Sequence, residues 1–215
     1  MKVAILISGR GSNMEKLIDS CKSFNKSACI ELVFSNNPEA SGLIFAKNNN
    51  IDTYVIDHRL FDKREDFDHE LDKKLRKSNI DFVCNAGFMR ILSENFVNSW
   101  FNKQLNIHPS LLPDFKGLNV HQRVVEAKST SSGCSVHLVR SGVDEGPIIS
   151  QMSTSIETND NEKIVAKKVL KLEHVLYPVC LKLFSDNLIE IDGEEIIYSK
   201  EAENLLHEIN AIIPE

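Results

Sequence analysis

The sequence predicts an α/β fold: a doubly wound, Rossmann-like and mostly parallel sheet with helices on both faces and antiparallel additions in the C-terminal half. Three observations predict it. Short apolar segments recur along the first half of the chain, amphipathic segments separate them, and a glycine-rich segment follows the first one. A continuous apolar run is typical of a strand buried on both faces, and strands that alternate with helices join through right-handed crossovers into a parallel sheet.

The first half of the chain contains five expected strands. They are the apolar segments 3–7, 29–35, 53–57, 81–86 and 103–107. Between residues 61 and 77, Phe67, Leu71 and Leu75 recur every four residues among charged side chains. This spacing predicts an amphipathic helix that packs over the sheet and leaves its charges in solvent.

The pattern changes from about residue 132. Two strands, a long helix and a final helix are expected there, over residues 134–140, 147–156, 159–184 and 200–211. The two strands are joined through the glycine-containing segment 142–146 and are expected to pair antiparallel. Pro178 would bend the long helix, and a short hairpin is expected to turn at Asp192-Gly193.

The length of 215 residues suits a single α/β domain with a sizeable core. We expect one catalytic domain over residues 1–190, divided into a phosphate- or nucleotide-binding half (1–100) and a catalytic half (101–190). Residues 191–215 are expected to form a tail of one hairpin and one helix. We expect a monomer or a homodimer.

Composition argues against several classes of protein. A net charge of −6 without a basic run is unsuited to a nucleic-acid-binding protein. Five cysteines without a Cys-x-x-Cys pair favour reduced thiols, and no histidines have metal-ligand spacing, so we expect no metal. The five apolar residues after Lys2 are too few for a signal peptide, and no segment approaches a membrane span. We therefore expect a cytoplasmic protein without a membrane partner.

Residues 106–113 (Asn-Ile-His-Pro-Ser-Leu-Leu-Pro) carry the strongest functional signal. Asn106 and His108 are two residues apart at the end of an expected strand, so their side chains point the same way. An amide N–H and an imidazole N–H that converge on one atom can stabilise the oxygen of a tetrahedral intermediate in acyl transfer. The alternative is a strand end with a capping Asn and a surface His.

Residues 8–13 (Ser-Gly-Arg-Gly-Ser-Asn) lie where the first strand gives way to the first helix. Gly9 and Gly11 let the backbone approach a phosphate, and Ser12 and Asn13 add donors at the helix N-terminus. A dinucleotide fingerprint would need a third Gly at Met14, and the P-loop Lys is absent, so a phosphate monoester such as a sugar phosphate is favoured. A tight turn with a capped helix is the alternative.

Asp144 lies in the turn-forming segment 142–147 (Gly-Val-Asp-Glu-Gly-Pro). A carboxylate there can pair with His108, raise the pKa of its imidazole and hold it as the imidazolium. An Asp that caps its own turn is the commoner case. The joint occurrence with Asn106 and His108 favours the catalytic interpretation.

Five motifs occur in order over roughly residues 1–190. They are 11–13 (Gly-Ser-Asn), 87–92 (Gly-Phe-Met-Arg-Ile-Leu), 106–113, 135–137 (Ser-Val-His) and 144–147 (Asp-Glu-Gly-Pro). This set resembles the phosphoribosylglycinamide formyltransferases of de novo purine (IMP) biosynthesis. The resemblance implies the formyltransferase fold. It also implies small-molecule substrates, with transfer of a formyl group from the co-substrate 10-formyltetrahydrofolate to the glycinamide amine of 5′-phosphoribosylglycinamide.

The resemblance implies roles for individual residues. Asn106 and His108 would stabilise the oxyanion, and Asp144 would tune His108. Binding of phosphoribosylglycinamide is implied for Gly11, Ser12, Asn13, Lys171, Glu173 and His174. Folate binding is implied for Arg64, Met89, Arg90, Ile91, Leu92, Asn106, Arg140, Ser141, Gly142, Val143 and Asp144.

Two further residues bear on the second, folate-binding and catalytic half. Gly142, near which many relatives carry acidic residues, is expected to loosen its loop. His137 is expected to be a hydrogen-bonded structural residue close to the site.

Three other functions stay open. Methionyl-tRNA formyltransferases share the three catalytic residues but need an RNA-binding domain, for which we expect no room after residue 190. Formyltetrahydrofolate hydrolases also share them and use water as the acceptor. They usually carry a preceding regulatory domain, whereas here the first strand is expected at residue 2. A folate or sugar-phosphate sensor without turnover is the third, and the complete catalytic set argues against it.

Overall fold

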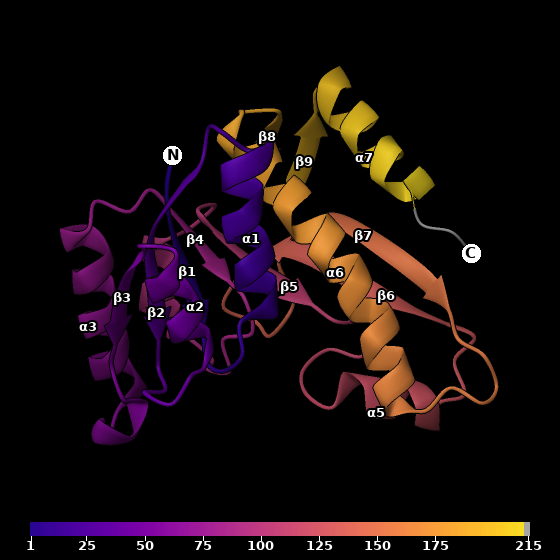
Figure 1. Ribbon diagram of the computed structural model, residues 1–215, viewed down its shortest axis with the longest axis horizontal. Helices are drawn as coiled ribbons and strands as arrows, with labels where there is room; N and C mark the ends of the chain where they lie inside the picture. Colours follow the sequence, from indigo (N-terminus) through magenta and orange to yellow (C-terminus); the bar gives the residue numbers. More distant parts are fainter. Residues whose placement is uncertain (213–215) are drawn as a thin grey trace. The chain divides into compact units, whose positions relative to one another are not determined.

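Seven strands form one mixed sheet in the computed structural model, which describes residues 1–212 (Figure 1). Their order across the sheet is β3-β2-β1-β4-β5-β6-β7. The strands are β1 (Lys2–Ile7), β2 (Cys29–Ser35), β3 (Asp52–Val55), β4 (Phe82–Asn85), β5 (Gln104–His108), β6 (Ser131–Leu138) and β7 (Ile148–Ser155). Strands β1 to β5 pair in parallel, whereas β6 and β7 pair antiparallel. The expected mostly parallel sheet with an antiparallel addition is confirmed.

Helices alternate with the strands, as the sequence predicted. They are α1 (Ser12–Ser23), α2 (Gly42–Asn48), α3 (Arg64–Lys77), α4 (Glu94–Ser99), α5 (Val120–Glu126), α6 (Glu162–Ser185) and α7 (Lys200–Ile212). A short 3-10 helix, η1 (His58–Leu60), precedes α3. The connections from β1 to α1, from β4 to α4 and from β5 to α5 all leave the carboxyl ends of parallel strands, where open α/β sheets bind their ligands.

The chain folds as two compact units. The first consists of residues 1–106 together with 139–141, and the second of residues 107–138 and 142–212. In the first unit, Ala4 and Leu6 of β1 belong to one apolar cluster with Phe67 of α3 and Phe96 of α4. Ile7, which points to the other face of the strand, lies against α2. Helices therefore cover both faces of these parallel strands.

Gly42 brings α2 close to the segment that follows β1. Its amide donates a hydrogen bond to the carbonyl of Gly9 over 3.2 Å. A Cβ atom added at Gly42 would lie 2.8 Å from Cδ1 of Ile7 and 2.9 Å from the carbonyl oxygen of Arg10. Because a real Cβ atom essentially never comes that close to a neighbour, this position requires glycine. The absence of a side chain thus lets residues 8–13 lie at the carboxyl end of β1.

In the second unit, α6 packs against β6, β7, α5 and α7. The side chain of Asn161 caps this helix by accepting a hydrogen bond from the amide of Ile164 over 3.1 Å. Pro178 lies inside the helix, and the buried face is formed by apolar side chains at helical spacing, among them Val165, Val169, Leu172 and Leu176. This apolar face is the reason that a 24-residue helix covers the antiparallel strands.

A hairpin and a helix follow α6. Strand β8 (Ile189–Asp192) pairs antiparallel with β9 (Glu195–Tyr198), and Gly193 has a φ of 61° at the turn, as the sequence predicted. Helix α7 buries Ala202 and Ile209. The last three residues of the expected tail, 213–215, lie outside the described residues. Among residues 1–212, no helix combines the length and the apolar character that a membrane crossing requires.

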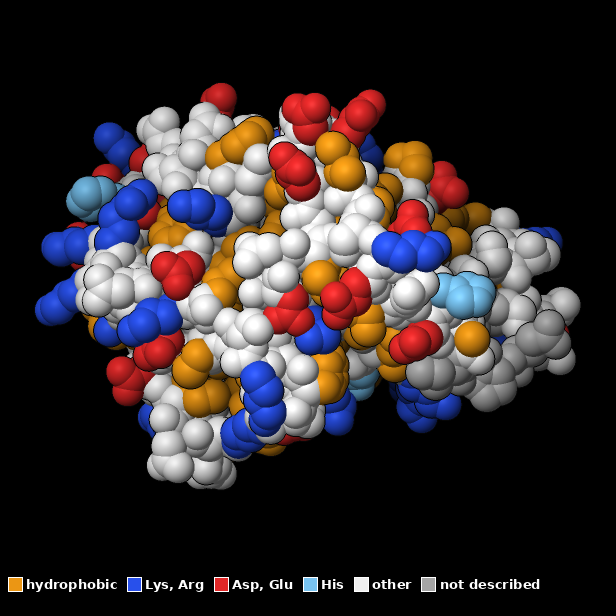
Figure 2. Space-filling model, turned by 90° about the horizontal axis from the view of Figure 1, so that it is seen from above, with side chains coloured by type: hydrophobic (Ala, Val, Ile, Leu, Met, Phe, Trp, Pro, Cys, Tyr) orange, Lys and Arg blue, Asp and Glu red, His pale blue; other side chains and the backbone are white. Residues whose placement is uncertain are grey.

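Charges of both signs are mixed on one face of the molecule. On the face shown in Figure 2, lysine and arginine side chains are interspersed with acidic and apolar ones and do not merge into a continuous stripe.

Replacing Gly42 by Ala is expected to lower the free energy of unfolding by about 1–3 kcal/mol, because overpacking of a close contact costs that much. Gly42 is the first residue of α2, so the ~1 kcal/mol that Ala gains over Gly in a helix interior does not apply there in full. Gly9→Ala is the matched control, since a Cβ atom there would meet no heavy atom within 4 Å. Urea denaturation of the two variants measures the difference, and equal stability would contradict the close contact.

Candidate active site

Strand β5 presents Asn106 and His108 at its carboxyl end. They are alternate residues of one strand, with buried Ile107 between them, so their side chains leave the same side of the strand. The register of β5 is set by its parallel pairing with β4, in which Asn106 lies opposite Asn85. Asn106 is half-buried, and His108 is only 5% exposed.

Both ring nitrogens of His108 face an acceptor within the second unit. Nδ1 lies 3.3 Å from Oδ2 of Asp144. Nε2 lies 3.0 Å from the carbonyl oxygen of Phe115. The pair expected from the sequence, His108 with Asp144, is therefore brought together. A protonated ring would donate to both acceptors, and a neutral ring to one of them.

Burial governs the protonation of His108. Loss of hydration lowers the pKa of its imidazole, although the Phe115 carbonyl and the Asp144 carboxylate both act to raise it. The sequence led us to expect that Asp144 raises the pKa of His108 enough to keep the ring protonated. Asp144 does act to raise this pKa, but burial outweighs it, so the expectation of a raised pKa is wrong. The sequence could not show how deeply the ring is buried, and that depth decides the balance.

Asp144 gathers three partners around its carboxylate. Oδ2 accepts a hydrogen bond from the amide of Gly117 over 2.9 Å, and Oδ1 lies 3.6 Å from Nε2 of His137. Burial acts to raise the pKa of this carboxyl, but the hydrogen bonds from His137 and Gly117 and the charge of His108 hold it below its usual value. Asp144 also has a φ of 53°, in the left-handed region that Asp tolerates better than most residues.

The contact between His137 and Asp144 was not expected from the sequence. His137 is a buried residue of β6, and its Nδ1 lies 2.8 Å from the carbonyl oxygen of Leu138. The expectation of a structural histidine near the site did not include this second interaction with the carboxylate. The available signal was a histidine inside an otherwise apolar strand, where a buried imidazole requires polar partners.

The segment after His108 is fixed by side chains of the antiparallel strands. The hydroxyl of Ser135 donates to the carbonyl of Ser110 over 2.6 Å and accepts from the amide of Leu112 over 3.0 Å. Gln151 donates to the carbonyl of Leu112 over 2.9 Å. The peptide bond between Leu112 and Pro113 is cis. These bonds tie the chain just beyond His108 to β6 and β7.

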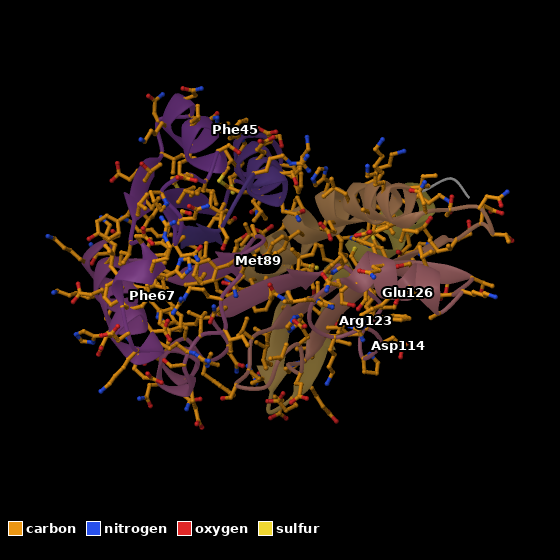
Figure 3. The ribbon with its side chains drawn as sticks, turned by 90° about the horizontal axis from the view of Figure 1, so that it is seen from below. Phe45, Phe67, Met89, Asp114, Arg123 and Glu126 are labelled. Atoms are coloured by element: carbon orange, nitrogen blue, oxygen red, sulfur yellow. The ribbon has the colours of Figure 1, made fainter. Side chains whose placement is uncertain are left out.

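The loop that carries Phe115 is held from two sides. Arg123 of α5, labelled in Figure 3, donates to the carbonyl of Lys116 over 2.6 Å and lies 5.5 Å from the centre of the Phe115 ring. Lys116 pairs with Glu145 over 3.0 Å. The other carboxylate oxygen of Glu145 lies where a Cβ atom at Gly142 would be. Gly142 therefore leaves room for the Glu145 carboxylate in this conformation, and the looser loop expected from the sequence stays a prediction.

The glycine-rich segment of the first unit forms a helix start. Gly11 is the N-terminal flanking residue of α1, with a φ of 74°, and its carbonyl accepts from the amide of Glu15 over 3.0 Å. Ser12 and Asn13 are the first two residues of the helix, and Asn13 is 9% exposed. Backbone amides at such a helix start favour an anion.

The residues expected to bind folate lie on several segments. Met89 and Ile91 are 69% and 55% exposed, whereas Leu92 is buried. The guanidinium of Arg90 lies 4.4 Å from the centre of the Phe67 ring, and Arg64 is an exposed residue that begins α3. Exposed apolar side chains beside a buried one suit a flat heterocycle.

Further along the chain, Arg140 is fixed by neighbours of its own unit. It donates to Oδ1 of Asn102 over 2.8 Å and lies 4.0 Å from the centre of the Phe101 ring. Ser141 and Val143 are exposed.

Three expected binding residues lie on α6 in the second unit. Lys171 is exposed, His174 is half-buried, and Glu173 is only 7% exposed. A buried carboxylate is uncommon unless it is paired, so the burial of Glu173 sets it apart from the solvent-exposed charges of this helix. Among residues 1–212, no group of His, Cys, Asp and Glu side chains is arranged to hold a metal ion.

Residues 1–181 match the model of the protein family described as formyl transferase. The chain belongs to this family. It is 38% identical over 191 residues to the phosphoribosylglycinamide formyltransferase of Escherichia coli. The aligned residues make up 89% of this chain and 90% of that relative. The crystal structure of phosphoribosylglycinamide formyltransferase from Anaplasma phagocytophilum has a TM-score of 0.86 at 40% identity, over 94% of this chain and 95% of that one.

Longer relatives also match. The human trifunctional purine biosynthetic protein adenosine-3 is 43% identical over 201 residues, or 93% of the chain. The chain spans only about a fifth of the length of this relative (20%). The formyl transferase match includes every residue for which a catalytic or ligand-binding role is expected, since the last of them is His174.

The free energy of unfolding is expected to fall as the pH drops below about 6.5, the ordinary pKa of histidine. Because the pKa of His108 is lowered on folding, the unfolded chain binds more protons between the folded-state pKa and that value. The contribution of His108 to the free energy of unfolding is complete above the unfolded-state pKa and is lost as the pH falls through the folded-state pKa.

His108→Gln is therefore expected to lose less stability than the unsubstituted protein between about pH 7.5 and about pH 5.5, measured by urea denaturation. His121, whose pKa burial also lowers, is present in both proteins, so the effect of its burial is common to both and cancels in the comparison. His207→Ala, at an exposed site on α7, is expected to keep the full pH dependence. The same dependence in His108→Gln as in the unsubstituted protein would contradict the lowered pKa.

Proposed function

We propose that this chain transfers the formyl group of 10-formyltetrahydrofolate to the amine of 5′-phosphoribosylglycinamide, a step of purine biosynthesis. The observation that carries the proposal is the buried contact of His108 with Asp144. His108 lies two residues after Asn106 on the same strand, β5. It occurs in a chain that covers 90% of the phosphoribosylglycinamide formyltransferase of Escherichia coli at 38% identity. An amide and an imidazole at the end of one strand are suited to acyl transfer.

In the proposed reaction, the amine nitrogen attacks the formyl carbon, and the electron pair of the carbonyl moves to its oxygen. The resulting oxyanion accepts hydrogen bonds from the Asn106 amide and from His108. The pair then returns to re-form the carbonyl as the bond to N10 of the folate breaks. The proton lost by the amine reaches N10, and a water beside the three residues carries it. Atoms and charge balance without a metal.

We assign the donor to Nε2 of His108. Nδ1 faces Asp144, whereas Nε2 faces a backbone carbonyl, that of Phe115. A neutral carbonyl is a weaker acceptor than an oxyanion, so a developing negative charge would compete well for this N–H. The same charge would raise the pKa of the imidazole against the effect of burial. Asp144 would hold the ring in place for this exchange of acceptors.

The remaining residues are assigned to the two substrates. The phosphate of phosphoribosylglycinamide would bind at Gly11, Ser12 and Asn13, where the α1 amides and dipole favour an anion. The buried carboxylate of Glu173 would accept hydrogen bonds from polar groups of the same substrate. Lys171 and His174 are close to it in the sequence. For the folate, the proposal assigns Arg64, residues 89–92 and residues 140–144.

The decisive experiment is release of tetrahydrofolate from 10-formyltetrahydrofolate with and without phosphoribosylglycinamide. The proposal expects release only when the amine is present, together with formylation of that amine. Equal release without the amine would identify a hydrolase that uses water. No release in either case, with both ligands still bound in a calorimeter, would identify a sensor. The last two outcomes each overturn the transferase.

The catalytic assignment is tested by Asn106→Ala, His108→Ala and Asp144→Asn. Loss of one oxyanion donor is expected to lower kcat by about 100- to 1,000-fold. Asp144→Asn is expected to lower kcat because an amide cannot hold the imidazole as a carboxylate does. His207→Ala, on the exposed side of α7, should leave kcat unchanged. Steady-state kinetics decides, and unchanged turnover in any two of the three variants would remove the assignment.

The substrate assignment is tested by Glu173→Gln and by Ser12→Ala combined with Asn13→Ala. Both changes are expected to raise KM for phosphoribosylglycinamide by about tenfold, the effect of losing a charge-assisted hydrogen bond. KM for the folate should change little. Glu190→Gln, at an exposed position of β8, is the control for loss of a carboxylate. Equal rises in both KM values would show that the two ligands have been misplaced.

A further inference from the structure

The segment from Gly87 to Ser93 connects β4 to α4 without regular helix or strand structure. It exposes Met89 and Ile91 and buries Leu92. We propose that Ser8 and Asp68 are positioning residues that hold this segment at its two ends in the shape that receives the folate ring system. The inference rests on the proposed function, because it concerns the residues to which that function assigns the folate.

Ser8 holds the beginning of the segment. Its backbone amide donates to the carbonyl of Gly87 over 3.0 Å, and its hydroxyl accepts from the amide of Met89 over 2.7 Å. The hydroxyl proton is directed elsewhere, since the same oxygen donates to Oδ1 of Asn36 over 2.6 Å. Asn36 is 3% exposed and interacts in turn with His58 through Nδ2, over 3.2 Å. The Ser8 hydroxyl, which accepts the hydrogen bond from the Met89 amide, is therefore held in place by Asn36 and His58.

Asp68 holds the end of the segment. It lies on the inner face of α3, is 2% exposed, and accepts the amide hydrogen of Ser93 at Oδ2 over 2.6 Å. Ser93 also caps α4 through its own hydroxyl, which accepts from Phe96 over 3.4 Å. A buried carboxylate is costly unless it is paired or strongly hydrogen-bonded. If the side chain at this position only packed α3, a neutral residue would make the fold more stable than Asp68 does.

Aromatic contacts fix the segment between these two points. Phe88 packs edge-on against Phe34 of β2, with ring centres 6.2 Å apart. Arg90 lies over the ring of Phe67, the residue that precedes Asp68 on α3. Figure 3 labels Phe67 and Met89. Burial raises the pKa of the Asp68 carboxyl, and the positive charge of Arg90 is one of the contributions that act against this rise.

The physical consequence is preorganisation. An irregular segment with exposed apolar side chains would lose conformational entropy when it binds a ligand, at about 1–2 kcal/mol per backbone residue that becomes fixed. A segment that is already held at both ends avoids part of this loss before the ligand arrives. Removal of either hydrogen bond should therefore weaken folate binding without removing any group that touches the reacting atoms.

The test measures binding of tetrahydrofolate by calorimetry to Ser8→Ala, Asp68→Ala and Asp68→Asn. Each Ala variant is expected to raise Kd by about tenfold, while kcat changes less than about twofold. Asp68→Asn retains an oxygen that can accept from Ser93 and is expected to bind within about threefold of the unsubstituted protein. It also serves if Asp68→Ala fails to fold.

Asp72→Ala is the matched control. Asp72 lies one turn later on α3 and accepts from Nε1 of Trp100 over 2.9 Å, beyond the end of the segment. Its loss should reduce stability and leave the Kd of tetrahydrofolate within about twofold. Hydrogen exchange gives a second readout: Ser8→Ala should speed exchange of the Met89 amide, and Asp68→Ala that of the Ser93 amide. A purely structural role would affect all these amides alike.

Failure of this inference can be separated from failure of the proposed function. Formyl transfer in the unsubstituted protein, with an unchanged Kd in both Ala variants, would overturn the positioning role alone. Tetrahydrofolate binding that both variants weaken, without any formyl transfer, would support the positioning role and overturn the transferase. Absence of tetrahydrofolate binding in the unsubstituted protein would overturn both.

Discussion

The carboxylate of Asp144 is the group on which the proposed active site depends. It meets His108 of β5 at 3.3 Å, His137 of β6 at 3.6 Å and the amide of Gly117 at 2.9 Å. Burial alone would raise the pKa of this carboxyl, but these partners hold it below its usual value. A displacement of any one partner would raise the pKa of this carboxyl and change the orientation of the group that fixes the imidazole.

The backbone supports this convergence at a local cost. Asp144 and Phe115 both have positive φ values, which are unfavourable for residues other than glycine, and Phe115 provides the carbonyl that faces His108. Ser135, Arg123 and the pairing of Lys116 with Glu145 hold the surrounding loops in these conformations. In the second unit, these stabilising interactions offset the cost of the unfavourable loop conformations, which is common in active sites.

The sequence predicted the features that depend on local patterns and missed those that depend on long-range packing. Apolar runs such as 3–7 and 29–35 are local, so the strands were predictable, and the spacing of Asn106 and His108 follows from strand geometry alone. The hydrogen bond from Met89 to Ser8 joins residues 81 apart in the chain, and no pattern reveals it. The net pKa direction of His108 depended on burial, which a charge pattern does not measure.

The lowered pKa of His108 fits the proposed chemistry better than a permanent imidazolium would. A neutral ring has a single N–H, yet it lies between the Asp144 carboxylate and the Phe115 carbonyl, so it satisfies only one of them at a time. A permanent positive charge would attract the formyl oxygen before and during reaction alike. A ring that keeps one proton on Nδ1 toward Asp144, and takes a second on Nε2 from the water that carries the amine proton only as the oxyanion forms, stabilises the transition state more than the bound substrate. That second proton then returns through the water to N10. Such differential stabilisation is what raises kcat.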